Sequence, residues 1–333
     1  MVQVIGPLYP EASATAKPDR RIGPRQPLTE RIMSLDLDTR FDPRHGEAVL
    51  VEPGIRRITA PNAGPMTFHG TNSYLVGNER LVIVDPGPDD DAHLAALLAA
   101  VDGRPVDAIL VTHTHLDHSA LSARLAKATA APLVAQGPHR ISRELADGEV
   151  NPLDAASDRA FAPDIVLADE AVMRLGETLV RGIHTPGHTG NHMAFALEGT
   201  GTVFSGDHVM AWATSVIAPP DGSMSDYFRS LDRFLARDDR RYLPGHGGPV
   251  ETPATFVRGL RTHRRMRESA ILEKVRAGVQ TVPEIVAAIY HTTDRRLHGA
   301  AALSVLAHLE SLIERGLVVL DGSFGVAGRF LPA

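Results

Sequence analysis

Short apolar runs that end in polar or glycine-containing turns dominate the middle of the chain, and they predict strands. The four clearest runs are Ala48–Val51, Tyr74–Val76, Leu81–Val84 and Ala108–Val111. From Asp90 to Val101, acidic residues are followed by a face of alanine and leucine, which predicts a helix. Strands, hairpins and helices alternate as far as Gly248. This mixture favours an α+β protein with two sheets and helices outside them over one doubly wound parallel sheet.

The two ends of the chain have different patterns, and together they suggest three domains. Residues 1–45 are rich in proline and arginine and predict an extended N-terminal arm, whereas residues 46–254 hold the alternating strands and helices. Residues 255–333 begin with a long basic helix and continue with two helices and a short hairpin, which is the make-up of a winged helix. The expected helices are Phe256–Ala277, Val282–Tyr290 and Gly299–Gly316.

Four segments far apart in the sequence join an apolar run to histidine or aspartate. The first has four such residues within six positions, and each of the others contains a glycine turn. A strand end that opens into a tight loop suits a metal ligand, because the strand fixes the base of the loop while the tip stays polar. The residues are His113, His115, Asp117 and His118 in the first segment, His188 in the second, Asp207 in the third and His246 in the fourth.

These seven side chains can hold two metal ions. Two histidines spaced by two on an extended loop point the same way, whereas the residues after them lie where the chain turns into a helix and swing toward a second position. We expect one site of His113, His115 and His188, another of Asp117, His118 and His246, and Asp207 between them. A carboxylate suits the middle position because it has two oxygens to share.

Composition narrows the metal and the setting. The chain has no cysteine, so nitrogen and oxygen must hold any metal ion. A net charge of −6, no apolar run near the ~20 residues of a membrane span and no secretory pattern lead us to expect a cytoplasmic protein without a membrane partner. A homodimer is left open. The charge is uneven, because residues 255–333 carry 11 basic and 7 acidic residues and residues 1–254 carry 23 and 33.

The order of the metal motif resembles that of the metallo-β-lactamase superfamily. The closer resemblance, over roughly residues 50 to 330, is to the β-lactamase-like protein 2 group, and it includes Gly64–Gly77, Thr214–Val216, Tyr227–Leu231 and the terminal winged helix. This resemblance implies an αβ/βα sandwich with the metals at one edge and a zinc hydrolase; the studied animal members are single-strand-specific endoribonucleases. The arm before about His45 and the Pro219–Gly222 insertion have no counterpart that we can place.

Three neighbours of the motif need separate interpretations. The resemblance implies that Asp85, at the end of a strand, orients a ligand histidine from behind. We include His208 with Asp117 and Asp207 among the catalytic residues because it follows the bridging carboxylate, although adjacent residues at a strand end point opposite ways. His192 is expected to be a packed histidine.

The expected reaction is hydrolysis by a hydroxide that bridges the two zinc ions. The leading substrate is the phosphodiester of single-stranded RNA, which the resemblance and the basic C-terminal region favour. The acidic remainder of the chain favours the alternative, a small-molecule hydrolase such as a glyoxalase II-like thioesterase, a lactonase or a β-lactamase. A nucleic-acid-binding module with a structural metal is the third hypothesis, and seven open nitrogen and oxygen ligands argue against it.

Overall fold

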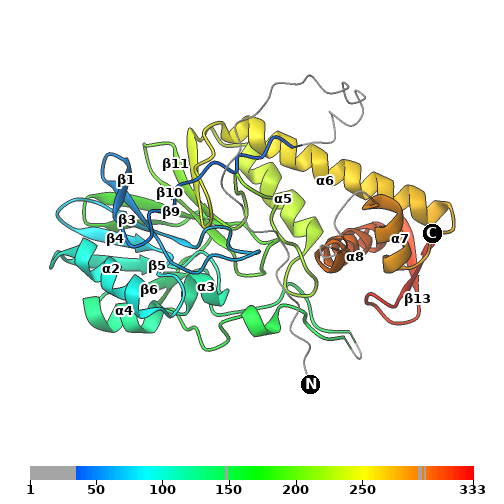
Figure 1. Ribbon diagram of the computed structural model, residues 1–333, viewed down its shortest axis with the longest axis horizontal. Coiled ribbons are helices and arrows are strands. Elements are labelled where there is room, and N and C mark those ends of the chain that lie inside the picture. The colour runs from blue at the N-terminus through cyan, green and yellow to red at the C-terminus, as the bar shows by residue number, and fades with distance from the viewer. Residues whose placement is uncertain (1–34, 147–148, 292–294, 296–297) are drawn as a thin grey trace, which may run out of the picture.

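The computed structural model describes residues 35–146, 149–291, 295 and 298–333, and its larger part is built around two stacked sheets (Figure 1). The first sheet has seven strands in chain order: β1 Val49–Glu52, β2 Ile55–Thr59, β3 Asn72–Val76, β4 Leu81–Val84, β5 Val106–Leu110, β6 Leu133–Ala135 and β7 Ile165–Val166. The second has five, in the order β12-β11-β10-β9-β8: β8 Val172–Leu175, β9 Thr178–His184, β10 Met193–Leu197, β11 Thr202–Gly206 and β12 Arg241–Pro244.

Helices cover the outer face of each sheet. Side chains such as Leu110 and Phe195 fill the space between the sheets, and β3, β4, β10 and β11 are buried along their whole length. Of these strands, β4 and β10 read as continuous apolar runs. The first sheet is covered by α2 Asp91–Val101 and α4 Ser122–Thr129, and the second by α5 Met224–Leu235 and α6 Pro253–Arg276. The expected αβ/βα sandwich is confirmed.

Parallel neighbours inside the sheets explain where the polar loops meet. Strand β4 runs parallel to β5, and β11 runs parallel to β12. The carboxyl ends of each pair therefore lie at the same edge, with Asp85, Thr112, Asp207 and Gly245 directly after or close to the four strand ends. After β5 the chain makes a one-turn helix, α3 Leu116–Ser119, before α4 begins.

The C-terminal region has a core of its own. It consists of the last turns of α6, α7 Val282–Ile289, α8 His298–Glu314 and the antiparallel pair β13 Val318–Asp321 and β14 Arg329–Pro332. The three helices and the hairpin agree with the sequence prediction to within a few residues. Helix α8 also packs against α5 and α6, so the region lies beside the second sheet's helices (Figure 1).

Most of the predicted arm, residues 1–45, lies outside the described residues. Residues 35–45 contain no helix or strand, and they are attached to the sandwich where the amide of Asp38 donates to the Ala211 carbonyl at 2.9 Å. Among the helices that the structure describes, none is long and apolar enough to cross a membrane.

Candidate metal centre

Loops that follow β5, β9, β11 and β12 bring all seven predicted ligands to one edge of the sandwich. Each of their histidines is buried, as is Asp207, while the side chain of Asp117 is 26% exposed. The side chains come from segments far apart in the chain, so their meeting is a property of the fold.

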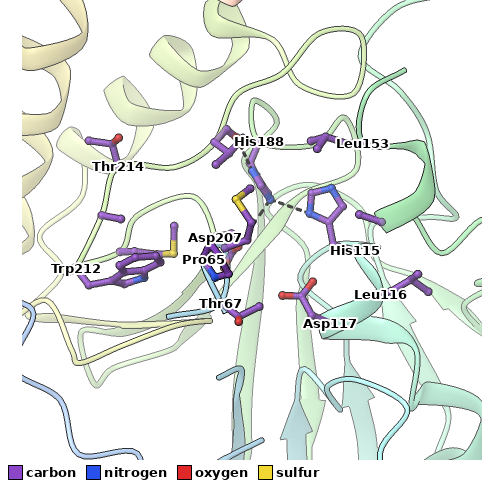
Figure 2. Close-up of a pocket in the computed structure, with 15 residues that line it drawn as sticks. Pro65, Thr67, His115, Leu116, Asp117, Leu153, His188, Asp207, Trp212 and Thr214 are labelled. Atoms are coloured by element: carbon purple, nitrogen blue, oxygen red, sulfur yellow. Dashed lines mark hydrogen bonds and ion pairs between the residues drawn. The ribbon is translucent and has the colours of Figure 1, made fainter. Parts of the chain in front are cut away.

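His113, His115 and His188 form the first cluster, which we call the three-histidine group. His115 Nδ1 lies 3.1 Å from His113 Nε2 and 3.0 Å from His188 Nε2. The three nitrogens lie within 4.8 Å of one another, and Figure 2 shows His115 and His188 joined by a dashed line among the residues that line a pocket.

Asp117, His118 and His246 form the second cluster, the carboxylate group. The two Nε2 atoms of its histidines are 3.2 Å apart, and Asp117 Oδ2 lies 3.2 Å from His246 Nε2 and 3.5 Å from His118 Nε2. Two nitrogens and one oxygen therefore converge here.

Asp207 lies between the two groups. Its Oδ1 is 3.4 Å from His118 Nε2, and its Oδ2 is 3.4 Å from His246 Nε2 and 3.8 Å from His188 Nε2. Oδ1 makes no hydrogen bond to the described part of the chain although it is buried. Both oxygens therefore face the carboxylate group, and Oδ2 also faces His188 of the three-histidine group.

In each of the five histidines of the two groups, one ring nitrogen faces the other ligands and the second, outer nitrogen contacts a protein oxygen. The outer contact leaves the inner nitrogen free to bind a metal ion. The outer nitrogens of three histidines contact a hydroxyl or a backbone carbonyl, and those of the other two contact a carboxylate. The Thr112 hydroxyl already donates to Asp85, so it accepts from the outer nitrogen of His113. The remaining distances are 3.1 Å for His113 Nδ1 to Thr112 Oγ1, 2.6 Å for His188 Nδ1 to the Val216 carbonyl, 3.2 Å for His246 Nδ1 to the Gly70 carbonyl, 2.9 Å for His118 Nδ1 to Asp85 Oδ2 and 3.0 Å for His115 Nε2 to Asp221 Oδ2.

His113 and His188 of the three-histidine group are neutral near pH 7. Burial and the neighbouring histidines hold the pKa of His113 well below its usual value, and burial lowers the pKa of His188 to about 4. Neutral imidazoles are the form that binds a metal ion.

The carboxylate group carries charge. Burial alone would lower the pKa of His246, but Asp207 and Asp117 outweigh it and raise the pKa to about 9. The pKa of His118 lies well above its usual value for the same reason. Burial opposes ionisation of Asp117 and Asp207, but the adjacent histidines hold the pKa of both carboxyls well below the usual range.

The donor set fits two divalent ions. Two nitrogens on one tetrahedral zinc with bonds of about 2.05 Å lie about 3.3 Å apart, and the histidine pairs here are separated by 3.0 to 3.2 Å. All donors are imidazole nitrogens or carboxylate oxygens, and the buried Oδ1 of Asp207 lacks a partner among the described residues. The residues present therefore fit a metal ion bound by nitrogen and oxygen.

Gly245 shows how tightly the backbone surrounds this centre. A Cβ atom there would lie 2.4 Å from His118 Cε1 and 2.6 Å from Asp207 Oδ1. Only glycine leaves room for both side chains, which accounts for the Pro-Gly-His turn after β12.

A pocket of about 320 Å³ opens above the cluster (Figure 2). Asp117, His115, His188 and Asp207 lie at its base, and the walls are mostly apolar. Trp212 forms one side and stacks on Phe68 with ring centroids 4.7 Å apart. The lining residues are Pro65, Met66, Thr67, His115, Leu116, Asp117, Leu153, Ala156, His188, Asp207, Met210, Trp212, Ala213, Thr214 and Val216.

His208 does not lie in this pocket. Its ring is fully buried, 4.5 Å from the Tyr227 ring and 5.6 Å from the Phe234 ring, and neither ring nitrogen has a hydrogen-bond partner within the described ranges. Burial lowers its pKa to about 3. The structure therefore gives no support to the catalytic role expected for His208. His192 is also buried, and its Nδ1 contacts the Thr185 hydroxyl at 2.8 Å, as expected for a packed histidine.

Contacts behind the cluster match one expectation and add one residue. Asp85 contacts His118, as the resemblance implied. Asp221, which contacts His115, was missed because it lies in the Pro219–Gly222 insertion and no periodic pattern or motif marks it. The only signal in the sequence was an acidic residue between prolines and a glycine, which is also an ordinary turn.

Comparisons with known proteins identify two regions of the chain. Residues 66–246 match the family described as the metallo-beta-lactamase superfamily, and residues 281–327 match the beta-lactamase associated winged helix domain. A beta-lactamase-like protein 2 homolog from Drosophila melanogaster is 30% identical over 280 residues, which cover 78% of this chain and 88% of that protein. An atrochrysone carboxyl ACP thioesterase from Aspergillus fumigatus is 29% identical over 72% of this chain and 70% of its own length.

Solved structures share the fold over most of the chain. A beta-lactamase domain protein from Burkholderia ambifaria superimposes with a TM-score of 0.72 at 22% identity and covers 92% of this chain and 98% of its own. A metallo-beta-lactamase family protein from Thermus thermophilus has a TM-score of 0.68 at 25% identity and covers 85% of this chain and all of its own.

Proposed function

This chain belongs to the metallo-β-lactamase superfamily and is a hydrolase with a winged-helix domain, and we propose that it uses two zinc ions to cleave thioesters or esters of apolar acyl groups. His113, His115 and His188 would hold one ion, Asp117, His118 and His246 the other, and Asp207 would bridge them. The domain division proposed with it is an arm at 1–45, a catalytic domain at 46–254 and a basic helix with the winged helix at 255–333.

The lining of the pocket is the observation that supports an apolar acyl group as the substrate. Nine of its fifteen residues are apolar, and no lysine or arginine is among these described residues. At about 30 Å³ for a water-sized group, the volume of about 320 Å³ admits on the order of ten non-hydrogen atoms. An apolar acyl group gains free energy by leaving water for such a surface, whereas an anionic backbone finds no lysine or arginine on the described wall.

The chain's own residues have clear tasks in this reaction. Bound zinc ions supply positive charge for the developing oxyanion and lower the pKa of water near them. Asp117 is the partly exposed carboxylate at the base of the pocket, and it accepts a hydrogen bond from the attacking water and so orients it. Leu116, Leu153 and Met210 exclude other water and hold the acyl group beside it.

The thioesterase among the relatives supports this substrate class. Its printed name assigns it a carboxyl-ACP thioester, and it aligns with nearly three quarters of this chain. A second relative from a Cryptosporiopsis strain carries the same kind of name at 26% identity.

Single-stranded RNA is the second candidate, because the stacked pair Trp212–Phe68 at the pocket offers a surface on which a base could stack. Other contacts weigh against it. Arg264 is buried and donates to the Ser215 carbonyl, Arg261 pairs with Asp232, and Arg265 pairs with Glu268. These residues of the basic helix are engaged within the protein rather than free for phosphate.

The contacts of helix α8 also weigh against RNA as the substrate. In a winged helix that reads nucleic acid, the third helix faces the groove. Here nine of its residues are buried, Glu310 pairs with Arg143, and Ser311 lies 3.1 Å from the Ser225 hydroxyl. The helix is used to pack against the catalytic part of the chain.

A panel assay separates the candidates. Zinc-loaded protein is given aliphatic acyl thioesters of increasing chain length, a lactone and single-stranded RNA, with the metal-stripped protein as the control. We expect kcat/KM for the thioesters to rise with chain length until the pocket is full. Cleavage of RNA with no turnover of any ester would overturn the proposal in favour of the second candidate.

A further inference from the structure

The Pro219–Gly222 insertion places a carboxylate behind the three-histidine group. We propose that Asp221 is a positioning residue, which fixes the ring of His115 and strengthens the binding of the ion held by the three-histidine group. The inference rests on the metal centre of the proposed function and adds a residue that the metal motif does not contain.

Two hydrogen bonds from Ser142 hold the backbone at Asp221 in place. Its side chain is 0% exposed, and the Ser142 hydroxyl donates to its backbone carbonyl at 2.8 Å. The amide of Ser142 donates to the Pro220 carbonyl at 2.8 Å as well. The insertion is therefore tied to the 136–146 segment, and the carboxylate points inward.

The contact with His115 decides which ring nitrogen faces the ions. Asp221 Oδ2 lies 3.0 Å from His115 Nε2, so Nε2 carries the hydrogen and donates it. The lone pair is then on Nδ1, the atom that converges with His113 and His188. A ring turned over would lose this hydrogen bond and present Nε2 to the wrong side.

The charge of Asp221 is less well compensated than that of Asp85. Asp85 accepts from the amide and the hydroxyl of Thr112 and contacts His118. Asp221 Oδ1 has no hydrogen bond to the residues that the structure describes, and the ion pairs described for this residue are with His115 and, at 3.9 Å, with His139. A buried carboxylate without a counter-charge is costly, and a cation on the far side of His115 supplies one.

Two substitutions separate the position of the ring from the charge. Asp221→Asn keeps an oxygen that accepts from His115 Nε2 and removes the charge, whereas Asp221→Ala removes both. Zinc affinity is measured by competition with a chromophoric chelator on the full chain. For the ion held by the three-histidine group, we expect about tenfold weaker binding in Asp221→Asn and about 100-fold weaker binding in Asp221→Ala. The affinity for the ion held by the carboxylate group should change less than about twofold. Asp232→Ala, which removes an exposed carboxylate that pairs with Arg261 on the basic helix, is the control and should bind both ions as the wild type does.

Two further readouts test positioning rather than stability. The ¹⁵N shifts of His115 in the metal-free protein should report Nε2–H in the wild type and in Asp221→Asn, and a mixture of tautomers in Asp221→Ala. The visible spectrum of the cobalt-substituted protein should change for one of the two ions only. Wild-type zinc affinity, tautomer and spectrum in Asp221→Ala would overturn the role of Asp221. If the wild type itself bound no zinc, the proposed function would fall first.

Discussion

The three-histidine group and the carboxylate group lie side by side and offer donors of similar geometry, but they differ in charge. His188, with a pKa of about 4, is neutral near pH 7, whereas His246, with a pKa of about 9, holds a proton. An ion that binds His188 displaces no proton near pH 7, whereas an ion that binds His246 displaces a proton that the neighbouring carboxylates stabilise. The two halves of the centre should therefore fill in order, and their difference can be tested.

Asp207→Ala should weaken metal binding at both groups together, because it removes the carboxylate that faces both. We expect loss of both ions and a fall in turnover of about 10³-fold or more. Metal analysis after zinc-supplemented purification, together with the thioester assay, checks this. Two ions and full activity in the variant would show that Asp207 does not bridge.

Substitution of one metal-binding histidine at a time should show whether the two groups are separate sites. His246→Ala should empty the carboxylate group and leave one ion per chain, with turnover reduced about 100-fold. His188→Ala should weaken the three-histidine group instead. Isothermal titration with zinc gives the number of ions for each variant, and identical profiles for the two would mean that the groups are not separate sites.

The pH dependence of zinc affinity should distinguish the groups without mutation. A metal ion must displace the proton of His246 below its pKa of about 9, so affinity at the carboxylate group should rise about tenfold per pH unit for each proton displaced from pH 7 to near 9. His188 is unprotonated throughout this range, so affinity at the three-histidine group should stay flat. Competition titrations at pH 7, 8 and 9 measure both; equal slopes would contradict the charge difference.

His208→Ala should have the smallest effect on the centre. We expect two ions and activity within about twofold of the wild type, because the ring packs on Tyr227 and Phe234 outside the pocket. The free energy of unfolding should fall by only about 1–2 kcal/mol, since the lost packing is partly offset by removal of two buried nitrogens that lack partners in the described part of the chain. Denaturant unfolding and metal analysis provide the check. Loss of an ion in the variant would show that His208 takes part in the metal centre.

The sequence predicted the parts of the molecule in which local pattern and chemistry coincide. The seven donors could be picked out because each follows a recognisable strand, and parallel strand pairs must bring their ends together. Asp221 could not be found in this way, because it is 106 residues from His115 and lies in a loop without periodicity. The Trp212–Phe68 pair was missed for the same reason, since stacking between two loops depends on tertiary packing alone. The sequence could not place the ring of His208, because a strand-end position alone does not say which way the side chain turns.

The spacing of the metal ligands along the chain has a consequence for folding. His118 and His246 are 128 residues apart, and His115 and His188 are 73 apart, so bound ions would join the two sheets as cross-links that close long loops. Such links reduce the conformational freedom of the unfolded chain and make opening of the sandwich depend on ion release. A chelator should then act as a slow denaturant of this protein, seen as faster proteolysis of the sandwich at a temperature where the zinc-loaded chain resists cleavage.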